Sequence, residues 1–167
     1  DKLVLSQIRK ALGLDETHGF YTGSAPISPE VVEYFASLNM PIFEGFGMSE
    51  CAGTYSLATK TTWKIGHCGR PLKGTYTKID PDTNELLIQG RNVFMGYMYD
   101  EKATQNTLSS DGFLHTGDIA SIDSENDPDV EPPSGFVKIV GRIKELIITS
   151  GGENMSPTHI ENLIKLY

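Results

Sequence analysis

The sequence has few cysteines, no long apolar segment and no excess of basic residues. Its 167 residues include two isolated cysteines, Cys51 and Cys68, without C-x-x-C spacing. This argues against a disulfide scaffold or a zinc site and indicates a reducing compartment. No apolar run approaches the roughly 20 residues that a membrane-spanning helix needs, and no signal peptide is visible. We therefore expect a cytoplasmic fragment without a transmembrane segment.

Basic residues are outnumbered by acidic ones. The chain carries 14 basic and 22 acidic residues, which gives a formal net charge of −8. A surface of that sign repels both nucleic acid and anionic membranes, so we expect neither as a general partner. Residues 123–133 hold five acids and no base, which is typical of a solvated acidic loop.

The apolar and charged fractions, 38% and 22%, are those of an ordinary globular domain. Residues 1–57 predict alternating strands and helices. An aromatic run at 20–22 predicts a strand, and Ser28-Pro29 predicts a capped helix start. A second strand is expected to end at Gly45. This order is typical of a parallel α/β sheet, whose ligands bind at the strand ends.

Residues 58–141 have β character. Two hairpins are predicted, one joining residues 76–79 to 85–89 and one joining 119–122 to 136–140. A short helix is expected after the capping residue Asp100. Residues 142–167 add a strand, a Gly-Gly turn and a capped helix whose apolar face ends at the last residue, which indicates a truncated chain.

Two glycine-containing segments are candidate ligand sites. The first is the small-residue loop Gly23, Ser24, Ala25 and Pro26, which lets a ligand approach the backbone closely, although taken alone this loop is better explained as a tight strand-to-helix turn. In the second, two glycines flank an aromatic ring on which a purine could stack, and a hydroxyl and a carboxylate suit phosphate and Mg²⁺. Its members are Glu44, Gly45, Phe46, Gly47, Met48, Ser49 and Glu50.

Two further segments carry polar residues near predicted strands. Asp118 follows a predicted strand, where a carboxylate can accept hydrogen bonds from a ribose diol. His115 resembles a general base, but its apolar surroundings favour a packed strand residue. Arg142 offers permanently charged donors beside a glycine. Lys144 follows, where the strand composition changes, and a hinge is plausible there.

Three segments, FGMSE, GFLHTGD and GRIKELI, occur here in the order found in adenylate-forming enzymes. From Phe20 onward the chain resembles that superfamily, which includes acyl-CoA synthetases, luciferases and peptide-synthetase adenylation domains. The segments ELLIQGRNVFMGYM and ELIITSGGENMSP are most similar to long-chain fatty acyl-CoA synthetases of the bubblegum type.

The resemblance implies a fold class of α/β plus β, a fragment of the large adenylate-forming domain. Residues 1–57 would end its parallel α/β subdomain, and residues 58–141 would form a small β-barrel subdomain. Residues 142–167 would form the hinge and the truncated start of the mobile carboxy-terminal α+β domain.

The resemblance also implies roles for the candidate residues. Gly23, Ser24, Ala25 and Pro26 would line the adenine and the acyl carboxylate. Phe46 would stack on adenine where the family usually has tyrosine. Ser49 would stand near the phosphate in place of threonine, and Glu50 would hold Mg²⁺, so these two are the candidate catalytic residues.

The ribose and the moving domain are assigned in the same way. Asp118 and Arg142 would bind the ribose hydroxyls. Lys144 would lie at the hinge, and Ser150, Gly151 and Gly152 would line the path of the coenzyme A pantetheine.

The implied activity is that of an ATP-dependent fatty acid–CoA ligase. The family's phosphate loop and its distal lysine are absent from the sequence, so we expect the isolated chain to be inactive. Peripheral membrane contact of the parent protein is compatible with this assignment. Two alternatives stay open: another adenylate-forming enzyme, such as an amino-acid-activating or luciferase-like one, and a nucleotide-binding module without catalysis.

Overall fold

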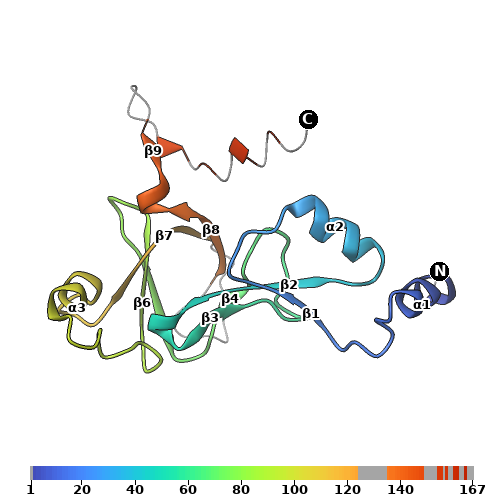
Figure 1. The fold of residues 1–167 in the computed structure, drawn as a ribbon, viewed down its shortest axis with the longest axis horizontal. Helices are drawn as coiled ribbons and strands as arrows, with labels where there is room; N and C mark the ends of the chain where they lie inside the picture. Colours follow the sequence, from blue (N-terminus) through green and yellow to red (C-terminus); the bar gives the residue numbers. More distant parts are fainter. Residues whose placement is uncertain are drawn as a thin grey trace.

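Two four-stranded β-sheets form the centre of the structure (Figure 1). The structure is a computed structural model and describes residues 2–123, 135–148, 154–155, 157, 160–161 and 164. Helix α1 (Lys2–Ala11) lies at one end of the molecule, and helix α3 (Glu101–Thr107) lies at the other. Among the described residues, no helix is both long and apolar enough to cross a membrane.

The first sheet has the strand order β1-β2-β3-β4. Strand β1 (Phe20–Thr22) runs parallel to β2 (Ile42–Met48), and helix α2 (Pro29–Ser37) connects them. Strands β3 (Gly53–Leu57) and β4 (Arg70–Pro71) continue the sheet in antiparallel pairing. The predicted strand–helix–strand unit with parallel strands is therefore confirmed.

The helix caps predicted at Ser28 and Asp100 are present, whereas the cap predicted at Ser156 lies outside the described residues. The Ser28 hydroxyl accepts a hydrogen bond from the Val31 amide at 3.4 Å, and the Asp100 carboxylate accepts one from the Ala103 amide at 2.9 Å. Each bond satisfies one of the amides that a helix leaves unpaired at its first turn. Asn39, which follows the C-terminal end of α2, has a φ of 58°, the left-handed conformation typical of the residue after a helix.

The prediction that the second strand ends at Gly45 is wrong. Strand β2 continues to Met48, because β3 pairs with its second half from Gly45 to Met48. Gly47 is needed for this pairing: a Cβ there would lie 1.6 Å from the carbonyl oxygen of Gly53. The glycines of this segment therefore admit a neighbouring strand, where the sequence had indicated a loop.

The second sheet is an antiparallel meander of β5 (Thr75–Ile79), β6 (Glu85–Gly90), β7 (Leu114–Asp123) and β8 (Phe136–Arg142). Both predicted hairpins are confirmed, β5 with β6 and β7 with β8.

The two sheets share one hydrophobic core. Its buried residues come from the first sheet and the adjoining turn η1 (Ser49–Cys51), and from the second sheet: Cys51, Tyr55, Leu86, Ile88, Leu114, Ala120 and Val137. The Tyr55 hydroxyl also lies 2.6 Å from that of Thr77 on β5. The Cys68 amide donates to the Val137 carbonyl of β8, and the Val137 amide donates to the Gly69 carbonyl, which joins the sheets further. The second sheet thus supports the strands that carry the candidate site.

The chain then leaves β8 through the short turn η2 (Ile143–Glu145). Strand β9 (Ile147–Ile148) pairs antiparallel with β10 (Asn154–Met155), which confirms the predicted strand for its described residues. Pro157, Ile160, Glu161 and Ile164 are helical, in line with the predicted last helix. Ser150, Gly151 and Gly152 lie outside the described residues.

Candidate nucleotide-binding site

An open groove of about 670 Å³ lies where β1 ends beside β2 and β3. It brings together two of the predicted segments, which are separated by about twenty residues in sequence. Its lining consists of Thr22, Gly23, Ser24, Gly45, Phe46, Gly47, Met48, Ser49, Ala52, Gly53, Thr54 and Leu57. Ala25, Pro26, Glu44 and Glu50 belong to the predicted segments but do not line this groove.

Parallel pairing explains why the two segments meet. Thr22 on β1 is opposite Glu44 on β2, so Gly23 and Ser24, which follow the end of β1, lie beside the continuation of β2 from Gly45. A Cβ at Gly23 would lie 3.2 Å from the carbonyl oxygen of Gly45, a tight contact. Ser24 has a φ of 68°, which turns the chain sharply away from the strand. The small side chains of Gly23 and Ser24 therefore leave the backbone accessible on this side of the groove.

Phe46 provides the aromatic surface of the groove. Its ring packs edge-to-face on Tyr55, with centroids 6.1 Å apart and planes at 83°. Tyr55 is fully buried in the shared core, so Phe46 has a rigid support. A flat ring held in this way can stack on a purine.

Glu44 has a different environment from the rest of its segment. Its side chain is only 9% exposed, and its Oε1 atom has no hydrogen-bond partner. Burial raises the pKa of Glu44, while a backbone hydrogen bond from Gly66 and the charge of His67 act against the rise. Glu44 therefore lies beneath the groove wall and not on it.

Ser49 and Glu50 begin the turn η1 directly after β2. Ser49 is exposed at the groove, whereas one oxygen of Glu50 accepts a hydrogen bond from the Tyr97 hydroxyl at 2.7 Å. That bond raises the pKa of Tyr97, because it stabilises the protonated phenol. Glu50 is only half-buried, so its carboxylate suits a single Mg²⁺ that takes its remaining ligands from phosphate and water. In the described part of the chain no three acidic, His or Cys side chains cluster to form a complete metal site.

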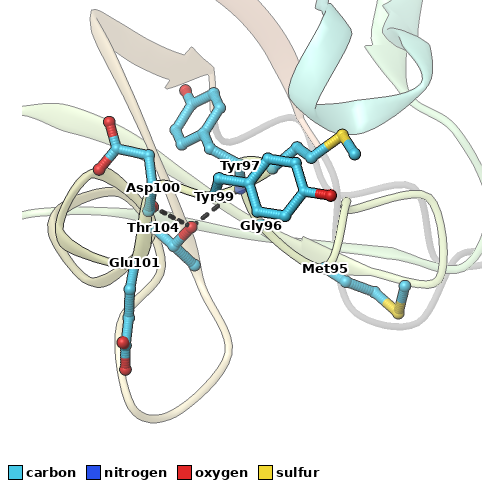
Figure 2. A pocket seen from close by; sticks show the side chains of 8 residues that line it. Met95, Gly96, Tyr97, Tyr99, Asp100, Glu101 and Thr104 are labelled. Atoms are coloured by element: carbon cyan, nitrogen blue, oxygen red, sulfur yellow. Dashed lines mark hydrogen bonds between the residues drawn. The ribbon is translucent and has the colours of Figure 1, made fainter.

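Tyr97 also borders a second pocket, of about 540 Å³, in the segment between β6 and α3. Its amide donates to the Thr104 hydroxyl at 2.8 Å, and that hydroxyl donates to the Asp100 carbonyl at 2.9 Å (Figure 2). The Phe94 amide bonds to the Glu50 carbonyl at 2.8 Å. The segment between β6 and α3 therefore contacts η1 through Phe94 and Tyr97, which both bond to Glu50. None of the residues of this segment was predicted to belong to the site.

Asp118 lies within strand β7, so its predicted position after a strand is wrong. Strand β7 already begins at Leu114, because β6 pairs with Leu114 and His115, and Asp118 is opposite Arg142 on β8. The two side chains form an ion pair, with Arg142 Nε 3.3 Å from Asp118 Oδ1. The structure thus brings the two predicted ribose residues together.

The pair combines a buried acid with an accessible base. The Asp118 side chain is 6% exposed and that of Arg142 is 66% exposed. Burial raises the pKa of Asp118, and the neighbouring Arg142 charge counteracts that rise. Such an acid is held in one orientation by its surroundings, while the guanidinium can still reach a ligand from solvent.

His115 is on strand β7, as predicted, but its side chain is 37% exposed and not fully packed. Its Nδ1 lies 2.9 Å from an oxygen of Glu85 on β6.

Lys144, the predicted hinge residue, is exposed in η2 two residues after Arg142. Neither Glu85 nor Tyr97 was singled out from the sequence, because only the pairing of distant segments reveals their contacts.

Comparison with known proteins agrees with this geometry. Residues 3–98 match the AMP-binding family, described as AMP-binding enzyme. The chain belongs to this family. It is 44% identical to the long-chain-fatty-acid–CoA ligase ACSBG2 of Xenopus laevis over 99% of its own length. It spans 22% of the length of that relative. The predicted resemblance is therefore confirmed.

Solved structures of adenylate-forming enzymes match the fold. The o-succinylbenzoate CoA synthetase MenE of Bacillus subtilis, in complex with the acyl-adenylate intermediate OSB-AMP, has a TM-score of 0.76 at 26% identity. That match covers 96% of this chain and 34% of MenE. ATP-bound MatB of Rhodopseudomonas palustris has a TM-score of 0.75 at 30% identity, covering 89% of this chain and 30% of MatB. These matches confirm the predicted fold class.

Proposed function

We propose that this chain is the nucleotide-binding part of an AMP-forming long-chain fatty acid–CoA ligase. The longer protein that contains it is called the parent protein below. One observation carries the proposal: a single groove gathers the Gly23–Ser24 loop and the segment from Gly45 to Ser49 around Phe46. The chain's membership of the AMP-binding family and its similarity to ACSBG2 support the same activity.

The proposed reaction has two steps. A fatty carboxylate oxygen attacks the α-phosphorus of ATP, and the bond to pyrophosphate breaks, which leaves acyl-AMP. The thiol of coenzyme A then loses its proton to solvent and attacks the acyl carbon, and AMP departs. Most of the rate enhancement in the first step comes from positioning and from neutralising phosphate charge.

Each site residue has a binding role in this proposal. Phe46 stacks on adenine, while Gly23 and Ser24 let the nucleotide approach the backbone. The Ser49 hydroxyl donates to a phosphate oxygen. Glu50 holds Mg²⁺, which supplies positive charge to the phosphates when bound. Asp118 accepts hydrogen bonds from the ribose hydroxyls, and Arg142 donates to the same hydroxyls.

The remaining assignments concern the domain that would move between the two steps. We place the subdomain boundaries at residues 57 and 141, with the hinge at Lys144. The loop Ser150, Gly151 and Gly152 would line the pantetheine path in the second step. Ala25, Pro26 and Glu44 would support the nucleotide site from behind its lining. The parent protein would act in the cytoplasm, with peripheral membrane contact where its lipid substrate resides.

The function is tested by fatty-acid-dependent exchange of labelled pyrophosphate into ATP, measured on the parent protein. We expect exchange with a long-chain fatty acid and formation of acyl-CoA when coenzyme A is added. The isolated 167-residue chain is the negative control, because it lacks the family's phosphate loop and distal lysine. Exchange supported by amino acids alone would favour an amino-acid-activating enzyme, and light emission would favour a luciferase-like one. Nucleotide binding without exchange would favour a non-catalytic module.

A further inference from the structure

We propose that Glu85 is a positioning residue that holds Asp118 in place for ribose recognition. The proposal rests on the assignment of Asp118 to the ribose made above. It begins from an irregularity in the pairing of β6 with β7. Glu85 is opposite Ile119, and Leu87 is opposite His115. One residue of β6, Leu86, therefore faces three residues of β7.

Those three residues, Thr116, Gly117 and Asp118, form a bulge. Gly117 has a φ of 72°, a conformation that glycine adopts without strain and that bends the strand outward. A bulge of this kind disrupts the regular ladder, so its backbone groups need other partners. Asp118 is at the end of the bulge, and its orientation depends on how the bulge is held.

Two side chains replace the missing ladder bonds. The buried Thr116 hydroxyl donates to the Leu86 carbonyl at 2.8 Å and accepts from the Asp118 amide at 3.1 Å. The Glu85 carboxylate reaches across from β6 and accepts from the Gly117 amide at 2.8 Å. Both side chains therefore attach the bulge to β6, Thr116 through the Leu86 carbonyl and Glu85 through the Gly117 amide.

Both oxygens of Glu85 are in use. Oε1 accepts from the Gly117 amide, and Oε2 lies 2.9 Å from His115 Nδ1. The side chain is 12% exposed, so this bonding occurs largely out of water, where each bond to a charged group is strong. Glu85 thus fixes the residues on both sides of Thr116. His115 has a structural explanation as its partner and needs no role as a general base.

The test compares ATP with 2′-deoxy-ATP in the parent protein, because the ribose hydroxyl is what Asp118 is proposed to read. A hydrogen bond to a charged group contributes about 1.5–3 kcal/mol, so we expect a wild-type preference for ATP in kcat/KM of roughly 10-fold or more. In Glu85→Ala the preference should fall to about 3-fold or less, because the bulge loses the bond to the Gly117 amide, one of its two side-chain attachments to β6. Glu101→Ala, which removes an exposed acid from α3, should leave the preference unchanged.

Two further variants keep the test decisive if Glu85→Ala unfolds. Glu85→Gln retains an acceptor for the Gly117 amide, and its amide group can donate to the neutral His115 ring, so the preference should survive. Glu85→Asp keeps the charge but shortens the side chain by one methylene group, so the preference should fall.

The outcomes separate this proposal from the function on which it rests. Equal losses with both nucleotides and an unchanged preference would show that Glu85 only stabilises the fold, which overturns the positioning role. A wild-type enzyme without any preference would overturn the ribose assignment of Asp118, and the positioning role with it. A parent protein without acyl-adenylate formation would overturn the proposed function itself.

Discussion

Replacing Gly47 by alanine should destabilise the parent protein and abolish acyl-AMP formation. The added Cβ would lie 1.6 Å from the Gly53 carbonyl oxygen and 2.8 Å from the Thr54 Cα atom. Both contacts are with backbone, so β3 must move as a whole. Overpacking typically costs about 1–3 kcal/mol, and we expect the upper end of that range because no side chain can rotate away.

The matched control is Gly23→Ala, a second glycine that lines the same groove. Its Cβ would have one neighbour within 4 Å, the Gly45 carbonyl oxygen at 3.2 Å, so a small shift suffices. Thermal unfolding and acyl-AMP formation, followed for both variants, should show the larger loss for Gly47→Ala. A Gly47→Ala protein that melts and reacts like the wild type would contradict the close pairing of β2 with β3.

The ribose pair gives the second large effect. Asp118→Ala and Arg142→Ala should each raise the KM for ATP by roughly 10-fold or more, since each removes a charged hydrogen-bonding group worth about 1.5–3 kcal/mol. Arg142 also orients Asp118 through their 3.3 Å ion pair, so the effects are coupled. The double variant should therefore lose less than the sum of the two single losses.

The test is a double-mutant cycle: the KM for ATP is measured for the wild type, the two single variants and the double variant. The exposed Lys138→Ala variant is a control for loss of a positive charge from the same strand, β8. Strictly additive losses would mean that Asp118 and Arg142 act independently, which disagrees with a shared ribose. An unchanged KM in Asp118→Ala would remove that residue from the site.

Local signals in the sequence were sufficient for much of the fold. The caps at Ser28 and Asp100, the parallel strands around α2 and both hairpins follow from short-range patterns, and all are present. Resemblance then singled out two separate segments, residues 23–26 and 44–50, and most of their residues line one groove in the structure.

The features that could not be predicted depend on long-range pairing. The extension of β2 past Gly45 requires β3 beside it, and the bulge before Ile119 appears only in the register between β6 and β7. Contacts such as those of Tyr97 with Glu50 and of Glu85 with Gly117 join residues more than thirty positions apart. Periodicity within one segment carries no information about such partners.

The central claim is that the groove around Phe46 binds the adenine of an acyl-adenylate. Its most direct test is a crystal structure of the parent protein with a non-hydrolysable acyl-adenylate analogue. We predict that adenine stacks on Phe46 beside Gly23 and Ser24, with the ribose hydroxyls within hydrogen-bond distance of Asp118. A nucleotide bound elsewhere, with Phe46 and Asp118 both out of contact, would contradict the account.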